Sequence, residues 1–402
     1  MDKELDFATL AAHVGLHQRV GDEVATVGPI VASTTFTADS VEQVHAALSP
    51  ESPGYAYARN ASPTVAAFER DFAPLEQAEE AVAFGSGMAA IRGALQSCHL
   101  HAGSRIVASS DLYGVTGSLL REFESYGVAV DYVDIANLDE VEAALDAPTA
   151  ALLFEAISNP LLKVADVAAL AGIAQKRGAT SVIDNTFATP VLLRPLAHGV
   201  DIVVHSATKY IAGHGDVVAG LVAGDRSRMT AVRQGRTISG SILSPFEAWL
   251  AMRGLRTLAV RYERQAESAG IVARWLDEQP WVERVYYPGL TDHPQHNLAR
   301  EQFAGRFGAM VAFDVAGGRD RAIDFMDNLL LIAPGTSLGD LASLILYPPA
   351  SSHRTLDDGQ LRAIGIGPGL VRLSVGIESP ADLISDLAQA ARSSEKGGLA
   401  AV

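Results

Sequence analysis

An aspartate and a lysine follow two successive apolar runs in the middle of the chain, and together they suggest a specific chemistry. Asp184 closes the run Ser-Val-Ile, and Lys209 follows Ile-Val-Val-His-Ser-Ala-Thr. A lysine among small and hydroxyl residues can form an imine with an aldehyde cofactor, and a carboxylate one strand away can keep that cofactor's ring nitrogen protonated. We therefore predict that Lys209 is the Schiff-base lysine for pyridoxal phosphate (PLP). Ser206 and Thr208 flank it and could bind the cofactor's phosphate.

A second motif could also hold the phosphate, because backbone N–H groups at a helix N-terminus favour anions. The run AVAF at 81–84 is followed by Gly-Ser86-Gly87-Met88 and a helix-like stretch. Gly87 would let the backbone approach the phosphate closely, and Ser86 adds a hydroxyl. Each motif taken alone has a plain alternative: a turn without ligand here, a capping carboxylate at Asp184, a surface amine at Lys209.

Two sequence patterns point to hydrolases instead, and in both cases the other motifs or residues that such an active site requires are missing. Ser206-Ala-Thr-Lys209 matches the Ser-x-x-Lys of penicillin-recognising enzymes, but no Lys-Thr-Gly or Ser-Asp-Asn follows. Gly-Thr-Ser337-Leu-Gly matches a nucleophile elbow, yet His353 follows too closely to leave room for the acid of a triad. A serine hydrolase is therefore a remote alternative, and a non-catalytic binding protein is the residual one.

The elements that position these residues follow an alternating pattern. Short β-branched runs alternate with helix-like stretches between about 61 and 245, which predicts a mostly parallel sheet with covering helices. Ligands bind beyond the C-terminal ends of the strands in such sheets. The runs expected as strands are 81–84, 105–109, 128–133, 151–156, 181–184 and 201–205.

We expect three regions along the chain. Residues 1–60 have few periodic runs and should form an N-terminal arm across a neighbouring subunit, and 61–250 should form the large cofactor-binding domain. Ser244-Pro-Phe-Glu is a capping-box helix start, and the helical pattern continues to about Glu278. This long linking helix should open a smaller α/β domain over 251–402.

Composition limits the possible partners. The 402 residues carry 31 basic and 47 acidic side chains, for a net charge of −16, which argues against nucleic acid or an anionic membrane. Cys98 is the single cysteine, so we expect neither an intrachain disulfide nor a thiolate metal cluster, and no metal site. No apolar run is long enough to span a membrane and no signal core is present, so a cytoplasmic enzyme is expected.

The motifs carry a family resemblance. Asp184-Asn-Thr, the stretch HSATKY at 205–210 and GHGD at 213–216 resemble the Cys/Met-metabolism PLP enzymes, with motifs most similar to methionine γ-lyases and cystathionine γ-lyases. The likeness runs from PIVASTTF at 29–36 to Glu378. It implies PLP as cofactor and the fold type I of PLP-dependent transferases, similar to aspartate aminotransferase. It also implies a homotetramer, a dimer of dimers with shared active sites.

The resemblance gives roles to further residues near the phosphate. Tyr57 and Arg59, in the stretch YAYARN, are similar to a pair that binds the cofactor phosphate of a neighbouring subunit. Gly87 and Met88 resemble the family's phosphate-binding turn.

Four other residues resemble groups around the cofactor ring and the substrate. Tyr113 is similar to the tyrosine that stacks on the ring and acts as acid or base toward the leaving group. Asn159 resembles the residue that bonds the cofactor's phenolic oxygen. Arg372 resembles the arginine that binds the substrate α-carboxylate, and Ser337 is similar to a serine that assists it.

The resemblance also bears on the reaction. Thr336 stands where cystathionine-handling members commonly carry glutamate, which argues against a cystathionine substrate. Methionine γ-lyases typically have cysteine where this chain has Val115, and Lys-Asp where it has Arg236-Thr237. We predict γ-elimination from methionine or a related thioether, giving 2-oxo acid, ammonia and thiol. The alternative is γ-replacement on an O-acyl-homoserine, as in a sulfhydrylase or a cystathionine γ-synthase.

Overall fold

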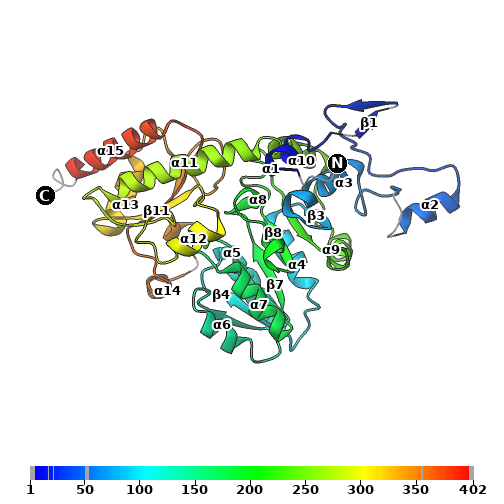
Figure 1. Cartoon of the computed structure of the whole chain (residues 1–402), viewed down its shortest axis with the longest axis horizontal. Coiled ribbons are helices and arrows are strands. Elements are labelled where there is room, and N and C mark those ends of the chain that lie inside the picture. Colours follow the sequence, from blue (N-terminus) through cyan, green and yellow to red (C-terminus); the bar gives the residue numbers. More distant parts are fainter. Residues whose placement is uncertain (1–4, 17, 21, 50–53, 355, 398–402) are drawn as a thin grey trace.

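The computed structural model describes residues 5–16, 18–20, 22–49, 54–354 and 356–397. Two sheets, each with its own helices, are joined by the long helix α11, which runs along the upper side of the view in Figure 1. None of the helices within these ranges is long and apolar enough to cross a membrane.

The larger sheet lies within 54–354 and has seven strands in the order β3-β9-β8-β7-β6-β4-β5. Strands β8, β7, β6, β4 and β5 pair in parallel, whereas β9 pairs antiparallel with both β3 and β8. The predicted mostly parallel sheet is therefore confirmed. Its strands are β3 (Glu80–Phe84), β4 (Arg105–Ser109), β5 (Ala129–Val133), β6 (Ala151–Glu155), β7 (Thr180–Asp184), β8 (Ile202–His205) and β9 (Gly220–Gly224).

Successive residues of the central strands alternate between two apolar cores, one on each face of the sheet. In β6, Leu152 and Phe154 pack into one core and Leu153 into the other. This double burial explains why the strands read as continuous apolar runs. The covering elements are α3 (Pro63–Phe72), η1 (Ala73–Glu76), α4 (Gly87–Gln96), α5 (Gly114–Ser125), α6 (Leu138–Ala144), α7 (Val167–Arg177), α8 (Thr189–Leu192), η2 (Pro195–His198) and α9 (Arg226–Ser239).

The smaller sheet has the order β10-β11-β14-β13-β12 in the described part of the chain, and it packs on α11, α13 and α15 around a third core. Helix α10 (Pro245–Leu255) instead packs on α3 in a core of the large sheet. The elements after it are α11 (Leu258–Asp277), β10 (Val282–Tyr286), α12 (His296–Gln302), β11 (Met310–Val315), α13 (Gly318–Asp327), β12 (Ala333–Pro334), β13 (Leu344–Leu346), η3 (Pro348–Ala350), α14 (Asp358–Ala363), β14 (Leu370–Ser374) and α15 (Pro380–Gly397).

The single linking helix expected from Ser244 is wrong in one respect, because two helices follow instead. Ser244 caps α10 as predicted, but α10 ends at Leu255 and α11 begins at Leu258. A Cβ at Gly254, inside α10, would overlap the carbonyl oxygen of Ala212, so glycine is needed where this helix approaches the lysine-bearing segment.

The N-terminal segment divides into a docked part and an extended part. Helix α1 places Phe7 and Ala11 in the core of the large sheet. The hairpin β1–β2 and helix α2, which has no buried residue, reach away from the body at the right of Figure 1. An extended segment that buries so little against its own chain needs another surface to pack on. These elements are α1 (Phe7–Ala12), β1 (Gln18–Val20), β2 (Glu23–Ala25) and α2 (Val41–Leu48).

Candidate active site

Lys209 lies in a tight turn just after β8, at the C-terminal edge of the large sheet. Its Nζ donates a hydrogen bond of 2.9 Å to Oγ of Ser337, which lies between strands β12 and β13 of the smaller sheet. Burial, followed by the positive charge of Arg372, lowers the pKa of Lys209 to about 8. A substantial fraction of this amine is therefore neutral, and so nucleophilic, near physiological pH.

Asp184 ends β7, the strand beside β8. Its Oδ1 accepts the backbone N–H of Thr186 at 2.9 Å and the Thr186 hydroxyl at 2.5 Å. The same hydroxyl accepts the N–H of Ser206 at 2.8 Å, so the aspartate and the lysine turn are tied together. Burial raises the pKa of Asp184. A protonated heterocyclic nitrogen would stabilise this carboxylate, because an opposite charge favours its ionised form.

The turn that we predicted to bind phosphate joins β3 to α4 and faces the lysine turn. Ser86 caps α4 by accepting the N–H of Ala89 at 3.1 Å. A Cβ at Gly87 would lie 2.7 Å from Oγ of Ser206, so only glycine lets these two turns approach so closely. Two hydroxyls and a helix N-terminus therefore converge here, a donor set suited to a phosphate.

Thr208 and Met88, which were also predicted to bind the phosphate, contact other groups of the chain. The hydroxyl of Thr208 donates to the carbonyl of Ala219 at 3.1 Å and accepts its N–H at 3.0 Å. The sulfur of Met88 lies 4.0 Å from the hydroxyl of Thr116. Thr208 thus braces the lysine turn in this structure, and Met88 can offer a phosphate only its backbone.

Arg372, on β14, links the smaller sheet to the site. Its guanidinium donates to Oδ1 of Asn159 at 2.8 Å and to the carbonyl of Ser337 at 3.4 Å. The side chain is 2% exposed, and its Nε has no hydrogen-bond partner among the described residues. Burial lowers the pKa of Arg372 to about 10. A buried guanidinium with a spare N–H is suited to a carboxylate ligand.

Glu155 is a residue of the site that the sequence analysis did not identify. It ends β6, directly beside Asp184 in the sheet register. One carboxylate oxygen accepts the N–H of Tyr113 at 2.7 Å, and the other accepts the N–H of Asn159 at 3.1 Å. An acidic side chain ending the apolar run Ala-Leu-Leu-Phe was the available signal.

The structure does not join Tyr57 and Arg59 to these residues. The Arg59 guanidinium donates to the carbonyl of Thr237 at 2.9 Å and lies 5.7 Å from the centroid of the Tyr57 ring. Neither makes a hydrogen bond or ion pair with the lysine turn or the Ser86 turn within the described ranges. Tyr57 is 42% exposed, which leaves its ring available to another chain.

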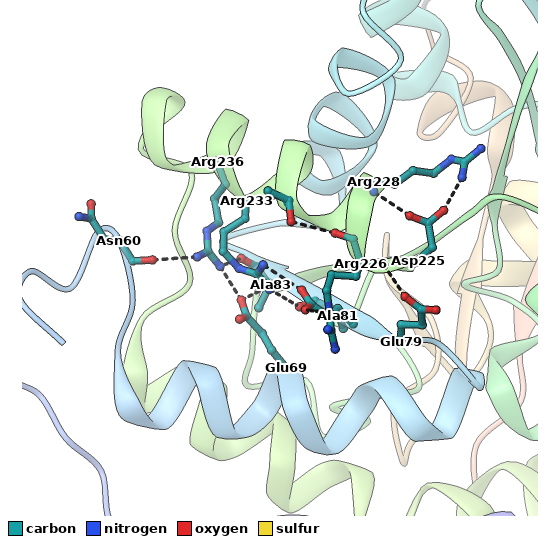
Figure 2. Close-up of polar contacts among 12 residues, drawn as sticks. Asn60, Glu69, Glu79, Ala81, Ala83, Asp225, Arg226, Arg228, Arg233 and Arg236 are labelled. Atoms are coloured by element: carbon teal, nitrogen blue, oxygen red, sulfur yellow. Dashed lines mark hydrogen bonds and ion pairs between the residues drawn. The ribbon is translucent and has the colours of Figure 1, made fainter. Parts of the chain in front are cut away.

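A buried ion pair fixes the point where this arm meets the body. Figure 2 shows Arg236 of α9 directed at Glu69 of α3, with 2.5 Å between their nearest atoms. The same guanidinium donates to the carbonyls of Ala83 at 3.0 Å and Asn60 at 3.3 Å. Arg236 thus anchors Asn60, the residue that follows Arg59, to α3 and α9.

A mostly parallel sheet with an aspartate and a low-pKa lysine at adjoining strand ends, facing a glycine turn at a helix N-terminus, defines a PLP-dependent enzyme of fold type I. The chain belongs to the Cys/Met metabolism PLP-dependent enzymes, whose sequence profile matches residues 8–392. The predicted family, fold class and cofactor are thereby confirmed.

Sequence relatives and a solved structure match this chain over nearly its whole length. L-methionine gamma-lyase of Pseudomonas putida is 41% identical over 96% of this chain and 98% of that protein. O-succinylhomoserine sulfhydrylase of Pseudomonas aeruginosa is also 41% identical, over 97% of this chain and 96% of that protein. Cystathionine gamma synthase from Xanthomonas oryzae pv. oryzae superimposes with a TM-score of 0.91 at 35% identity, covering 98% of this chain and 100% of that one.

Proposed function

We propose that this enzyme catalyses γ-elimination on methionine or a related thioether amino acid, releasing a thiol, a 2-oxo acid and ammonia. The observation that carries the proposal is the placement of the Lys209 amine beside Ser337 and the buried guanidinium of Arg372. This arrangement suits a substrate with a carboxylate and an acidic Cα–H. The similarity to the Pseudomonas putida methionine gamma-lyase supports the thioether.

We assign a residue of this chain to each polar group of the cofactor. Ser86, Gly87 and Ser206 would hold the phosphate, and Asp184 would pair with the ring nitrogen. When bound, PLP supplies an electron-poor ring that withdraws negative charge from the substrate Cα. Asn159 would bond the phenolic oxygen, since Arg372 occupies only the Oδ1 of its amide.

The protein's own groups would then move protons. Lys209 would take the proton from Cα and pass it on, because its lowered pKa favours the neutral amine and its long stem gives reach. Arg372 would hold the substrate carboxylate in a bidentate pair. Tyr113, whose ring is partly exposed at the N-terminus of α5, would stack on the cofactor and protonate the leaving sulfur.

Replacement on an O-acyl-homoserine is the second candidate, supported by the similarity to the Pseudomonas aeruginosa sulfhydrylase. The two reactions share their early proton transfers. In replacement an incoming nucleophile bonds to Cγ, whereas in elimination none does. Membership of the family removes the support for a serine hydrolase or a non-catalytic binding protein.

A substrate panel separates the two reactions. The enzyme would be incubated with methionine, homocysteine, cystathionine, O-acetylhomoserine and O-succinylhomoserine, each with and without sulfide. We expect 2-oxobutanoate and a thiol from methionine without sulfide. Homocysteine formed from an O-acyl-homoserine only when sulfide is present, with methionine left intact, would instead establish replacement.

We further propose that residues 1–60 form an intersubunit arm, that 61–250 and 251–402 are the large and small domains, and that the enzyme is a cytoplasmic homotetramer. The exposed helix α2 and the outlying hairpin support the arm. In a two-fold pair, each arm would bring Tyr57 and Arg59 to the phosphate of the other subunit.

Mixing two inactive variants tests this sharing. We expect Arg59→Ala and Lys209→Ala to be inactive separately, because each damages both sites of a symmetric pair. Subunits refolded together should recover roughly a quarter of the wild-type activity, since half the pairs are mixed and each mixed pair has one intact site. The steady-state rate after co-refolding is the measurement. Activity no higher than in the separate variants would contradict the shared site.

The acidity of Lys209 predicts how cofactor capture depends on pH. A neutral amine attacks an aldehyde and an ammonium does not, so the rate of PLP incorporation into apoenzyme should rise with pH and level off above about 8. An ordinary lysine would instead give a rate still rising toward pH 10. The growth of the visible absorbance band after PLP is added reports this rate.

A further inference from the structure

The carboxylate of Glu155 makes two contacts that belong to the site rather than to the sheet. Its oxygens accept N–H groups from Tyr113 and Asn159, two residues on separate loops after β4 and β6. The side chain is buried, with 7% of its surface exposed. The contacts therefore join two cofactor-facing loops through one side chain.

Burial makes this a costly place for an acid. Desolvation, with the neighbouring negative charge of Asp184, raises the pKa of Glu155 well above its usual range, while the two backbone N–H groups oppose that shift. An apolar residue in its place would leave the buried N–H of Asn159 and the partly buried N–H of Tyr113 without an acceptor. The presence of a carboxylate at this buried position is thus explained by its hydrogen bonds to the two loops and not by the packing of β6.

The contacts of Glu155 continue to the substrate-binding groups. Asn159, whose N–H Glu155 accepts, itself accepts the Arg372 guanidinium through Oδ1 at 2.8 Å. Arg372 donates to the carbonyl of Ser337, and the Ser337 hydroxyl accepts the amine of Lys209 at 2.9 Å. A displacement of Glu155 would therefore be transmitted through these hydrogen bonds to Arg372 and to Lys209.

We propose that Glu155 is a positioning residue that sets Tyr113 and Asn159 against the bound cofactor by accepting both of their backbone N–H groups. The proposal rests on the cofactor contacts proposed above for these two residues. In this role Glu155 acts through the two loops.

Glu155→Gln provides the test, because the amide has one acceptor oxygen where two N–H groups need one each. The NH₂ group would face a backbone N–H, and one loop must move. We expect the dissociation constant for PLP, titrated into apoenzyme, to rise roughly tenfold or more. The visible circular dichroism of the bound cofactor should change, because the ring loses its fixed orientation, and KM should rise with displacement of Arg372.

Asp386→Asn is a matched control for the loss of a carboxylate that accepts backbone N–H groups. Asp386 accepts those of Leu330, Leu331 and Ile332 at 2.8 to 3.0 Å, on the smaller domain side. We expect this variant to lose thermal stability while keeping wild-type PLP affinity and dichroism. If Glu155→Gln does not fold, Glu155→Asp, whose oxygens reach less far, is judged by the same measurements.

Asn159→Ala separates this proposal from the one on which it rests. Loss of PLP affinity and altered dichroism in both Asn159→Ala and Glu155→Gln would support the positioning role. An effect in Asn159→Ala alone would overturn the role of Glu155 and leave the cofactor contacts standing. Unchanged PLP affinity and dichroism in Asn159→Ala would overturn both.

Discussion

Lys209→Ala should lose turnover by at least about a thousandfold, because proton transfer by a positioned side chain contributes roughly 10² to 10⁴ in rate and the covalent attachment is lost as well. The folded structure should persist, since the amine donates one hydrogen bond, to Ser337. PLP should still bind, without covalent attachment, through the phosphate turn and Asp184. The measurements are kcat on the preferred substrate and removal of PLP by gel filtration.

Lys163→Ala is the control for removing a partly buried lysine. Nζ of Lys163 lies 2.6 Å from Oδ2 of Asp111, and this ion pair lies at the same edge of the large sheet as Lys209. We expect this variant to retain covalently bound PLP and most of the activity. Wild-type turnover in Lys209→Ala would remove the catalytic role assigned to that amine.

Arg372→Lys should raise KM for the amino-acid substrate by roughly tenfold or more, because the pair loses one hydrogen bond to a charged group, which contributes about 1.5 to 3 kcal/mol. Lysine keeps the positive charge but cannot form the planar two-point contact with a carboxylate. It also cannot bond both Asn159 and the Ser337 carbonyl as the guanidinium does. Steady-state kinetics would show the change chiefly in KM, with a smaller loss in kcat.

Arg284→Ala gives a matched control, since this exposed arginine lies over the ring of Tyr286 on β10, away from the site. Its KM should equal that of the wild type. A KM for Arg372→Lys within twofold of the wild type would show that the substrate carboxylate binds elsewhere.

The sequence was sufficient to predict where residues lie when their position follows from the local chain. Asp184 and Lys209 each follow an apolar strand, and parallel strands bring their C-terminal ends together, so the pair could be placed before the fold was seen. The Ser86–Gly87 turn was predictable for the same reason, because a strand, a small-residue turn and a helix are contiguous in the chain.

Residues whose roles depend on distant partners were not predictable. Glu155 reads as the end of an apolar strand, and only the fold shows the two loops that bond it. Arg236 pairs with Glu69, which is distant in the sequence, so the sequence did not indicate that Arg236 is an anchor. The break between α10 and α11 was likewise not predicted, because the helical pattern of the sequence continues through it.

The central claim is that the side chain of Lys209 carries the cofactor, and reductive trapping tests it most directly. The holoenzyme would be treated with borohydride, digested and analysed by peptide mass mapping for a pyridoxyl group. The chain has five lysines, at positions 3, 163, 176, 209 and 396, so the adduct can be placed unambiguously. We predict a single adduct, on Lys209; an adduct on any other lysine, or on none, would contradict the mechanism proposed for this enzyme.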